Sequence, residues 1–286
     1  SIPVVVDVVN KANQIKPTRV LLEKGLGVHR DAPLPKYSSN TARKRLSKTD
    51  VGSVGVTQTS STTGRIGIFL TCYGNRNAPN IVEDMTLIFR HNGVDVAITE
   101  SERCCGMPKL ELGDLSSVEA LNKDNIAQLM KLVRRGYDLT APIPSCVLMF
   151  KQELPLMFPD DEDVRAVAEA FFDPFEYLML RHREGQFEQS FKNSLGNVAY
   201  HVPCHQRVQK IGPKTREVLE LIPDTDVTMI ERCSGHDGTY AVKKENYEFA
   251  QKICRPVVSR VEQANADHFI SDCPMAGELI EHGMSD

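Results

Sequence analysis

The stretch that decides the fold reads Glu102-Arg103-Cys104-Cys105-Gly106-Met107-Pro108. Adjacent side chains point in different directions, so two neighbouring thiols can face one site only where the backbone turns sharply. Gly106 permits such a turn because glycine tolerates backbone angles that other residues avoid. The apolar run at 94–98 has the composition of a β-strand. We therefore expect the cysteine pair on a loop at the carboxyl end of a strand.

The cysteines occur in two sets of the same order, each cysteine following an apolar run. The first set and then the second are Cys72, Cys104 with Cys105, Cys146; and Cys204, Cys233, Cys273. Corresponding members lie 132, 129 and 127 residues apart. Three anchors at a nearly constant offset indicate an internal duplication.

Length and composition restrict the class of protein. A chain of 286 residues with 41% hydrophobic and 25% charged residues suggests a globular protein of two domains or one large domain. The net charge of −4 gives no reason to expect a nucleic-acid partner. No apolar run approaches the roughly 20 residues that span a bilayer, and no signal peptide is visible. We expect a fragment of a longer protein, located in the cytoplasm or on the cytoplasmic face of a membrane.

We expect four segments along the chain. An N-terminal segment and polar linker (1–64) precede a first cysteine-rich domain (65–155), a helical connector (156–197) and a second cysteine-rich domain (198–286). The linker carries a basic cluster, Arg43-Lys44-Arg45 with Lys48, which is interpreted as solvated surface, with contact to an acidic partner as the alternative.

The first repeat has the pattern β-α-β-α-β. Apolar residues at helical spacing follow Pro79, Asn92-Gly93 ends that helix, and a second helix is expected over 117–135. In the second repeat a helix over 243–265 buries Cys254 on its apolar face, so Cys254 is left out of the site. The expected fold class is α/β, with two pseudo-twofold-related units that contain small parallel sheets and carry cysteines at the strand ends. Parallel α/β sheets place ligands at this end.

Eight cysteines without an export signal favour metal ligation over disulfides. Several thiolates together select zinc, copper(I) or an iron–sulfur cluster. The close cysteine pairs typical of structural zinc sites are absent, as is the clustered pattern of ferredoxins. Metal type remains open on these grounds.

The repeated motifs resemble the duplicated cysteine-rich (CCG) domain family, which occurs in heterodisulfide reductase B subunits and in iron–sulfur subunits of anaerobic glycerol-3-phosphate dehydrogenase and of glycolate and lactate oxidases. The motifs are Cys-Cys-Gly at 104–106 and Pro-Ser-Cys at 144–146, then Pro-Cys-His at 203–205, Cys-Ser-Gly at 233–235 and Asp-Cys-Pro at 272–274. The run at 231–245 is most similar to the glycerol-3-phosphate dehydrogenase type. A ferredoxin domain often precedes this region in the family, and no such motif occurs in this sequence.

The resemblance implies an iron–sulfur centre in each domain. It assigns Cys72, Cys104, Cys105 and Cys146 to a first site, with a [4Fe–4S] cluster as the expected cofactor, and Cys204, Cys233 and Cys273 to a second. The sequence departs from the family where Met149, Ala276 and Ser234 replace cysteines. His236 and His205 are the candidates for the missing ligand of the second site, which would hold iron–sulfur or zinc.

The resemblance implies an iron–sulfur electron-transfer subunit of a flavin-dependent dehydrogenase or reductase complex. Its expected partners are a flavoprotein subunit, a ferredoxin-type domain or subunit, and a quinone or membrane anchor. No flavin or nucleotide fingerprint occurs in the sequence, so substrate oxidation would take place on a partner. The alternatives are catalytic disulfide reduction at an open cluster and a structural role with zinc.

Overall fold

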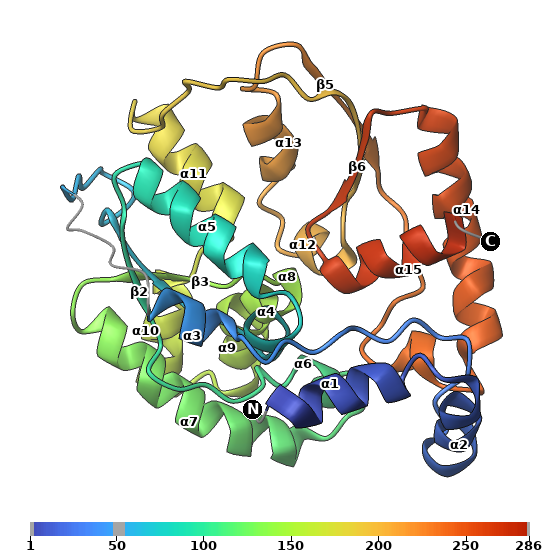
Figure 1. Ribbon diagram of the computed structural model, residues 1–286. Helices are drawn as coiled ribbons and strands as arrows, with labels where there is room; N and C mark the ends of the chain where they lie inside the picture. Colours follow the sequence, from blue (N-terminus) through green and yellow to red (C-terminus); the bar gives the residue numbers. More distant parts are fainter. Residues whose placement is uncertain (1–2, 48–54, 285–286) are drawn as a thin grey trace. The chain divides into compact units, whose positions relative to one another are not determined.

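The computed structural model describes residues 3–47 and 55–284, and its contacts divide the chain into two compact units (Figure 1). We call Asn40–Ser194 with His205–Pro223 the first-repeat unit. Ser1–Ser39, Leu195–Cys204 and Asp224–Asp286 form the second-repeat unit. The segment between the first two strands of the second repeat therefore belongs to the first-repeat unit. No helix in the described part of the chain is both long enough and apolar enough to cross a membrane.

The first-repeat unit contains a parallel sheet of strands β1 (Arg65–Ile68), β2 (Asp95–Ile98) and β3 (Asp138–Thr140), in the order β2-β1-β3. Ile68 pairs with Ile98 on one side and with Thr140 on the other. Helix α5 (Pro79–His91) contacts β2, and α7 (Leu115–Val133) contacts β3. The core between strands and helices contains Ile66, Ile68, Val82 and Phe89, which are fully buried.

Helix α5 forms where the sequence predicts it. Pro79 stands in the first turn, where its missing N–H costs nothing, and the buried residues Val82, Thr86 and Phe89 recur at helical spacing. Gly93 then adopts a positive φ of 69°, which ends the helix.

The remaining helices of the first-repeat unit surround this sheet or follow its third strand. They are α3 (Ala42–Leu46), α4 (Cys72–Arg76), α6 (Met107–Leu110), α8 (Pro144–Leu148), a π-helix (Met149–Glu153), α9 (Leu154–Met157), α10 (Glu162–Ala170), α11 (Pro174–Arg183) and α13 (Lys214–Leu219). The break expected at Asp173-Pro174 separates α10 from α11, and Asp173 caps α11 in a capping box with Glu176.

The sequence pattern predicted that the basic cluster of the linker is solvated surface, but two of its arginines form ion pairs within the protein. Arg43 and Arg45 lie on α3 and form ion pairs with Glu102 and Glu83, and both arginines are only partly exposed. Lys48 lies outside the described residues. The cause is a long-range contact, because Glu102 lies 59 residues further along the chain than Arg43.

The second-repeat unit contains an equivalent parallel sheet. Strands β4 (Gly196–His201), β5 (Thr225–Ile230) and β6 (His268–Ser271) are in the order β5-β4-β6, with His201 opposite Ile230 and Ser271. The short helix α12 (Cys204–Arg207) follows β4. Helix α14 (Tyr247–Ala264) contacts β5, α15 (Pro274–Met284) contacts β6, and these two helices contact each other. Two small parallel sheets of the same strand order confirm the expected α/β class.

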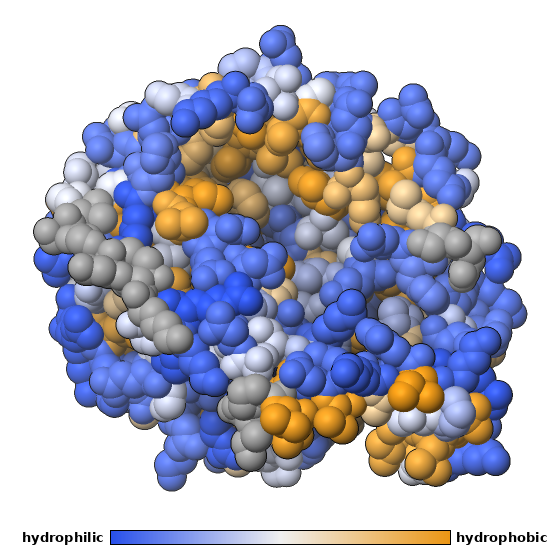
Figure 2. All heavy atoms as spheres, in the orientation of Figure 1, coloured by the Kyte–Doolittle hydropathy of each residue, from blue (hydrophilic) through white to orange (hydrophobic). Residues whose placement is uncertain are grey.

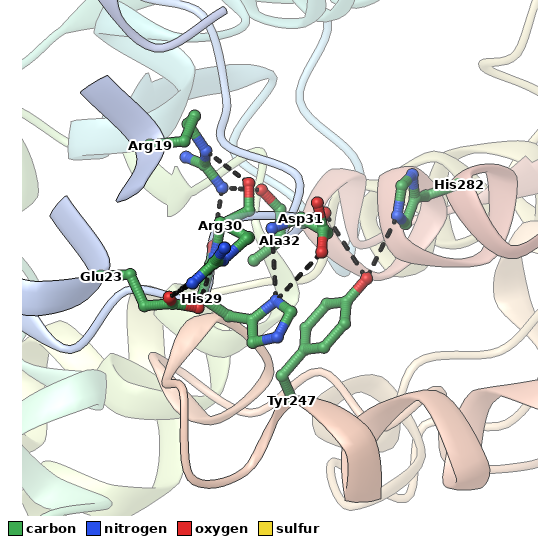
Figure 3. Close-up of polar contacts among 8 residues, drawn as sticks. All are labelled: Arg19, Glu23, His29, Arg30, Asp31, Ala32, Tyr247 and His282. Carbon is green, nitrogen blue, oxygen red and sulfur yellow. Dashed lines mark hydrogen bonds and ion pairs between the residues drawn. The ribbon is translucent and has the colours of Figure 1, made fainter. Parts of the chain in front are cut away.

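Residues 3–39 form helices α1 (Pro3–Ala12) and α2 (Lys16–Leu26) and an extended segment within the second-repeat unit. This segment contacts the region around the start of α14 at two points. Val28 forms a β-bridge with Lys243, just after a short 3₁₀ helix (Tyr240–Val242). The His29 ring stacks on the Tyr247 ring, with their centroids 3.9 Å apart (Figure 3). Apolar side chains gather on the surface of α1 and α2 (Figure 2). The most exposed of them are Val4, Val8, Leu21 and Leu26.

Candidate metal centres

The four cysteines of the first set leave the same edge of one sheet. Cys72 begins α4 directly after β1, Cys104 and Cys105 follow β2, and Cys146 lies on α8 after β3. Because the three strands are parallel and in register at their carboxyl ends, their following loops meet above that edge. The structure brings all four predicted residues together.

The four thiols form a row of neighbours. The Cys146 and Cys105 sulfurs lie 3.1 Å apart in the buried part of the site. Cys105 hydrogen-bonds with Cys104, which in turn hydrogen-bonds with Cys72. Cys105 and Cys146 are buried, whereas Cys72 is exposed, so the row runs from the core to the surface.

This row favours one thiolate at Cys104. Hydrogen bonds from Cys105 and then from Cys72 lower the pKa of the Cys104 thiol, assisted by the Gly106 N–H and the charge of Lys109. The same bonds to Cys104 raise the pKa values of Cys105 and Cys72. A metal ion would displace the remaining protons, because thiolates and not thiols are the ligands.

Two asparagines of α7 hold the backbone of the cysteine pair. The Asn122 side chain donates to the carbonyl oxygen of Cys105 at 2.9 Å. Asn125 donates to the Cys104 carbonyl at 3.1 Å and accepts the Arg103 N–H at 2.8 Å. Both side chains are buried, so the turn is fixed from the core side by two residues three positions apart on one helix face.

The turn itself requires Gly106. Its φ is +96°, and a Cβ at this position would lie 3.2 Å from the Asn122 side-chain nitrogen. Thr71, just before Cys72, also has a positive φ of 62° with ψ of 160°, a region that non-glycine residues rarely occupy. Its hydroxyl accepts the Gly74 N–H at 2.9 Å and so caps α4. Both unusual backbone positions adjoin predicted ligands.

The loop before the cysteine pair is anchored through Glu102. Its carboxylate bonds with Arg43, accepts from Asn75 at 3.2 Å and accepts the Thr99 hydroxyl at 2.9 Å. Arg43 also donates to the Thr99 carbonyl oxygen. This network links α3, α4 and the end of β2.

The second set of cysteines has the same topological origin. Cys204 follows β4, Cys233 follows β5 and Cys273 follows β6, all at the carboxyl edge of that sheet. The pKa of Cys233 is raised, mainly by a hydrogen bond with the Cys204 thiol and to a smaller extent by burial. The Gly235 N–H also points at the Cys233 sulfur, at 3.4 Å. Cys254 is buried in α14, where burial raises its pKa to about 11 and its thiol lies 3.8 Å from the Leu279 carbonyl oxygen.

A buried histidine that the sequence pattern does not single out ties these loops together. One ring nitrogen of His201 lies 3.0 Å from the Ser271 hydroxyl, and the other lies 3.0 Å from the Arg232 carbonyl oxygen. Ser271 also accepts the Cys273 N–H at 3.4 Å. His201 therefore positions the loops of Cys233 and Cys273.

The two histidines proposed for the second site are placed differently. The His205 ring lies 3.7 Å from a Glu111 carboxylate oxygen, within the first-repeat unit. His236 lies one residue beyond Gly235, and its N–H donates to the Ser234 hydroxyl at 3.3 Å. Ser234, which stands where the first set has Cys105, is buried. His236 thus lies on the same loop as Cys233, three residues beyond it.

A pocket of about 600 Å³ opens beside Cys233. Its other lining residues are Arg232, Tyr240, Phe249, Lys252 and Ile253. Cys233 is exposed, and the pocket gives access to this residue from solvent.

The thiols of the first set are not arranged around a single metal ion. No group of three or more His, Cys, Asp or Glu side chains is arranged to hold a metal ion among residues 3–47 and 55–284. Thiolates on one zinc ion lie about 3.8 Å apart, given a bond of about 2.3 Å to each. The 3.1 Å between Cys105 and Cys146 must therefore widen on metal binding.

Comparison with known proteins agrees with this duplicated arrangement. The model of the cysteine-rich domain, CCG, matches residues 66–151 and 198–275. The chain belongs to this family. The two matches contain both sets of cysteines and all of both sheets except the first residues of β1 and β4.

Several curated proteins are similar to this chain. The C subunit of anaerobic glycerol-3-phosphate dehydrogenase from Escherichia coli K12 is 28% identical over 281 residues, covering 97% of this chain and 68% of that protein. The B subunit of fumarate reductase (CoM/CoB) from Methanothermobacter marburgensis is 26% identical, covering 87% of this chain and 47% of that protein. Lactate utilization protein A of Bacillus pumilus is 25% identical, covering 73% of this chain and 87% of that protein.

Proposed function

We propose that this chain is an iron–sulfur electron-transfer subunit of a flavin-dependent dehydrogenase or reductase complex. The observation that carries the proposal is the row of four neighbouring thiols at the carboxyl edge of the first sheet. Relatives named as subunits of a dehydrogenase and of a reductase support it. So does similarity to an uncharacterized iron–sulfur protein of Methanocaldococcus jannaschii, 26% identical over 213 residues.

We assign Cys72, Cys104, Cys105 and Cys146 as ligands of the first centre. A cluster bound there would accept and release single electrons. The chain's own residues would hold the Cys104 thiolate with the Gly106 N–H and Lys109, and would fix the ligand backbone with Asn122 and Asn125.

The second centre is assigned to Cys204, Cys233 and Cys273, with His236 or His205 as the further ligand and iron–sulfur or zinc as the metal. Three thiolates and an imidazole carry less negative charge than four thiolates. A second iron centre would therefore have a higher reduction potential than the first. The partners we propose are a flavoprotein subunit as electron donor and a ferredoxin-type domain or a quinone as acceptor.

Metal analysis and optical spectroscopy of anaerobically purified protein test this function. We expect iron with a broad visible absorption that dithionite bleaches, and Cys105→Ser should remove most iron from the first centre while Cys254→Ala retains it. Cys233→Ser should affect only the second centre, as measured by EPR of the reduced protein. A colourless sample that contains zinc and no iron would refute electron transfer and support the structural role.

Reduction of a small disulfide at the second site is the alternative function, favoured by the pocket beside Cys233. The disulfide would take up two electrons and two protons and leave as two thiols, with electrons supplied by a reduced partner. Arg232 and Lys252 would attract an anionic substrate. Disulfide turnover by the isolated chain with a chemical reductant, abolished in Cys233→Ser, would favour this alternative over electron transfer alone.

A further inference from the structure

A hollow of about 300 Å³ lies in the N-terminal segment of the second-repeat unit, at the start of α2. Polar and basic side chains line one part of it, and a short apolar run lines the other. The lining residues are Asn10, Asn13, Gln14, Lys16, Arg19, Arg30, Ala32, Pro33, Leu34, Pro35 and Lys36. No acidic residue lines it.

Arg19 is the buried charge of this hollow, with only 7% of its surface exposed. Its Nε and Nη2 atoms donate to the carbonyl oxygens of Arg30 and His29, both at 2.8 Å, and Nη2 also donates to that of Ala32 at 2.5 Å (Figure 3). The buried Nη1 atom has no hydrogen-bond partner in the structure. All bonded acceptors of this cation are neutral carbonyl oxygens, and the Asp31 carboxylate acts on it only through its charge.

The first turn of α2 adds to the positive character. Its N-cap residue is Ile15, which cannot cap the helix, and the turn contains no acidic residue. The N–H groups at the start of an uncapped helix and the positive end of its dipole favour anions. Lys16 stands at the first helical position and contributes a full charge.

The other arginine of the hollow is already neutralised. Arg30 forms an ion pair with Glu23 through two of its nitrogens, one at 2.9 Å. The contrast is informative, because one arginine of this hollow has a carboxylate partner and the more buried one has none. Burial lowers the pKa of Arg19, although the nearby charges of Asp31 and Tyr247 oppose this shift, and a bound anion would offset more of the cost of burial.

We propose that this hollow binds a small oxyanion, a phosphate or carboxylate group with a short carbon body. The anionic group would lie beside the Arg19 guanidinium and accept hydrogen bonds from the backbone N–H groups of Lys16 and Thr18, with the Lys16 side chain adding charge. The wall of Ala32, Pro33 and Leu34 would contact the carbon body. This site is separate from the cysteine sets, so it does not depend on the proposed electron transfer.

Calorimetric titration of the full chain tests the site with inorganic phosphate and with succinate, each against sodium chloride of equal ionic strength. Saturable binding of both supports a shared oxyanion site, and saturable binding of one supports the site and identifies the group. Backbone amide shifts of Lys16, Thr18 and Arg19 should follow the same titration. Heat and shifts equal to those in chloride would refute the proposal.

Two lysines of the same helix provide a matched pair of variants. Lys16→Ala should weaken binding about tenfold, since it removes a charge-assisted contact, whereas Lys24→Ala at the other end of α2 should leave binding unchanged. Arg19→Gln should abolish binding, with circular dichroism to confirm that the helices remain. Equal affinity of Lys16→Ala and the parent chain would also overturn the proposal. Iron content should not change in any of these variants, which distinguishes this test from that of the cysteines.

Discussion

Replacing Asn125 with alanine should loosen the cysteine turn without touching a ligand. The Asn125 side chain is fully buried and is bonded at once to the Arg103 N–H and to the Cys104 carbonyl oxygen. Alanine leaves both backbone groups without that partner and leaves a small cavity. Asp124 is the matched control, because it is the adjacent residue on α7 and contacts the same Arg103 only through an exposed ion pair.

The expected cost follows from these contacts. An unsatisfied buried polar group costs about 1 to 3 kcal/mol, and the lower end applies because Cys104 is only partly buried and water can reach its loop. Two such groups and the lost packing give about 2 to 3 kcal/mol. The Asp124→Ala change should cost about 0.5 kcal/mol or less, since surface ion pairs contribute little.

Thermal unfolding and chelator challenge under anaerobic conditions measure both effects. A loss of about 2 to 3 kcal/mol should lower the unfolding midpoint of Asn125→Ala by roughly 5 to 10 °C. Iron should leave the first centre faster in this variant than in Asp124→Ala, with the second centre unaffected. Parent-like stability together with parent-like iron retention in Asn125→Ala would show that the asparagine does not hold the turn.

Three further changes test other parts of the structure. Gly235→Ala should destabilise the chain by about 3 kcal/mol, because the φ of Gly235 is +80° and a Cβ would lie 2.5 Å from a carbonyl oxygen of α14. Gly27→Ala is its control: the φ is +67° but no atom lies within 4 Å, so the cost should be about 1 kcal/mol. Urea denaturation measures both. His236→Ala should shift or abolish the EPR signal of an iron centre at the second site, and an unchanged spectrum would exclude this ligand. The ion pair with Arg30 lowers the carboxyl pKa of Glu23 from 4.5 to about 2. The stability that this carboxylate contributes is therefore fully present above pH 4.5 and is lost as the pH falls toward 2. Glu23→Gln should make the free energy of unfolding less dependent on pH in that range.

The positions of the strands and cysteines could be predicted because their signals are local. An apolar run followed by a cysteine identifies a strand and its carboxyl end within about seven residues, and parallel pairing then gathers those ends. Pro79 and Gly93 mark the boundaries of α5 by their own backbone preferences. Gly106 was predicted as a turn residue for the same reason, and its positive φ confirms it.

The residues that hold the cysteine loops could not be predicted, because their partners are distant in sequence. Asn122 and Asn125 follow the cysteine pair by about 20 residues, and polar residues on a predicted helix are ordinarily assigned to its solvated face. Two asparagines three positions apart beside the apolar stripe were the available signal. Arg43 was likewise predicted to be solvated, because its partner Glu102 is distant in sequence.

The two repeats share their strand order but not the means by which they fix their ligand loops. In the first, α7 holds the cysteine pair from one side through amide groups, and four thiols adjoin one another. In the second, the position of Cys105 is taken by the buried Ser234, and the imidazole of His201 joins the loops from within the sheet. The position at the end of β1 that corresponds to His201 is Phe69, which cannot make those bonds. Because both the donors and their supports differ, the scaffold predicts where each site lies, whereas the metal that it binds depends on residues outside the repeated pattern.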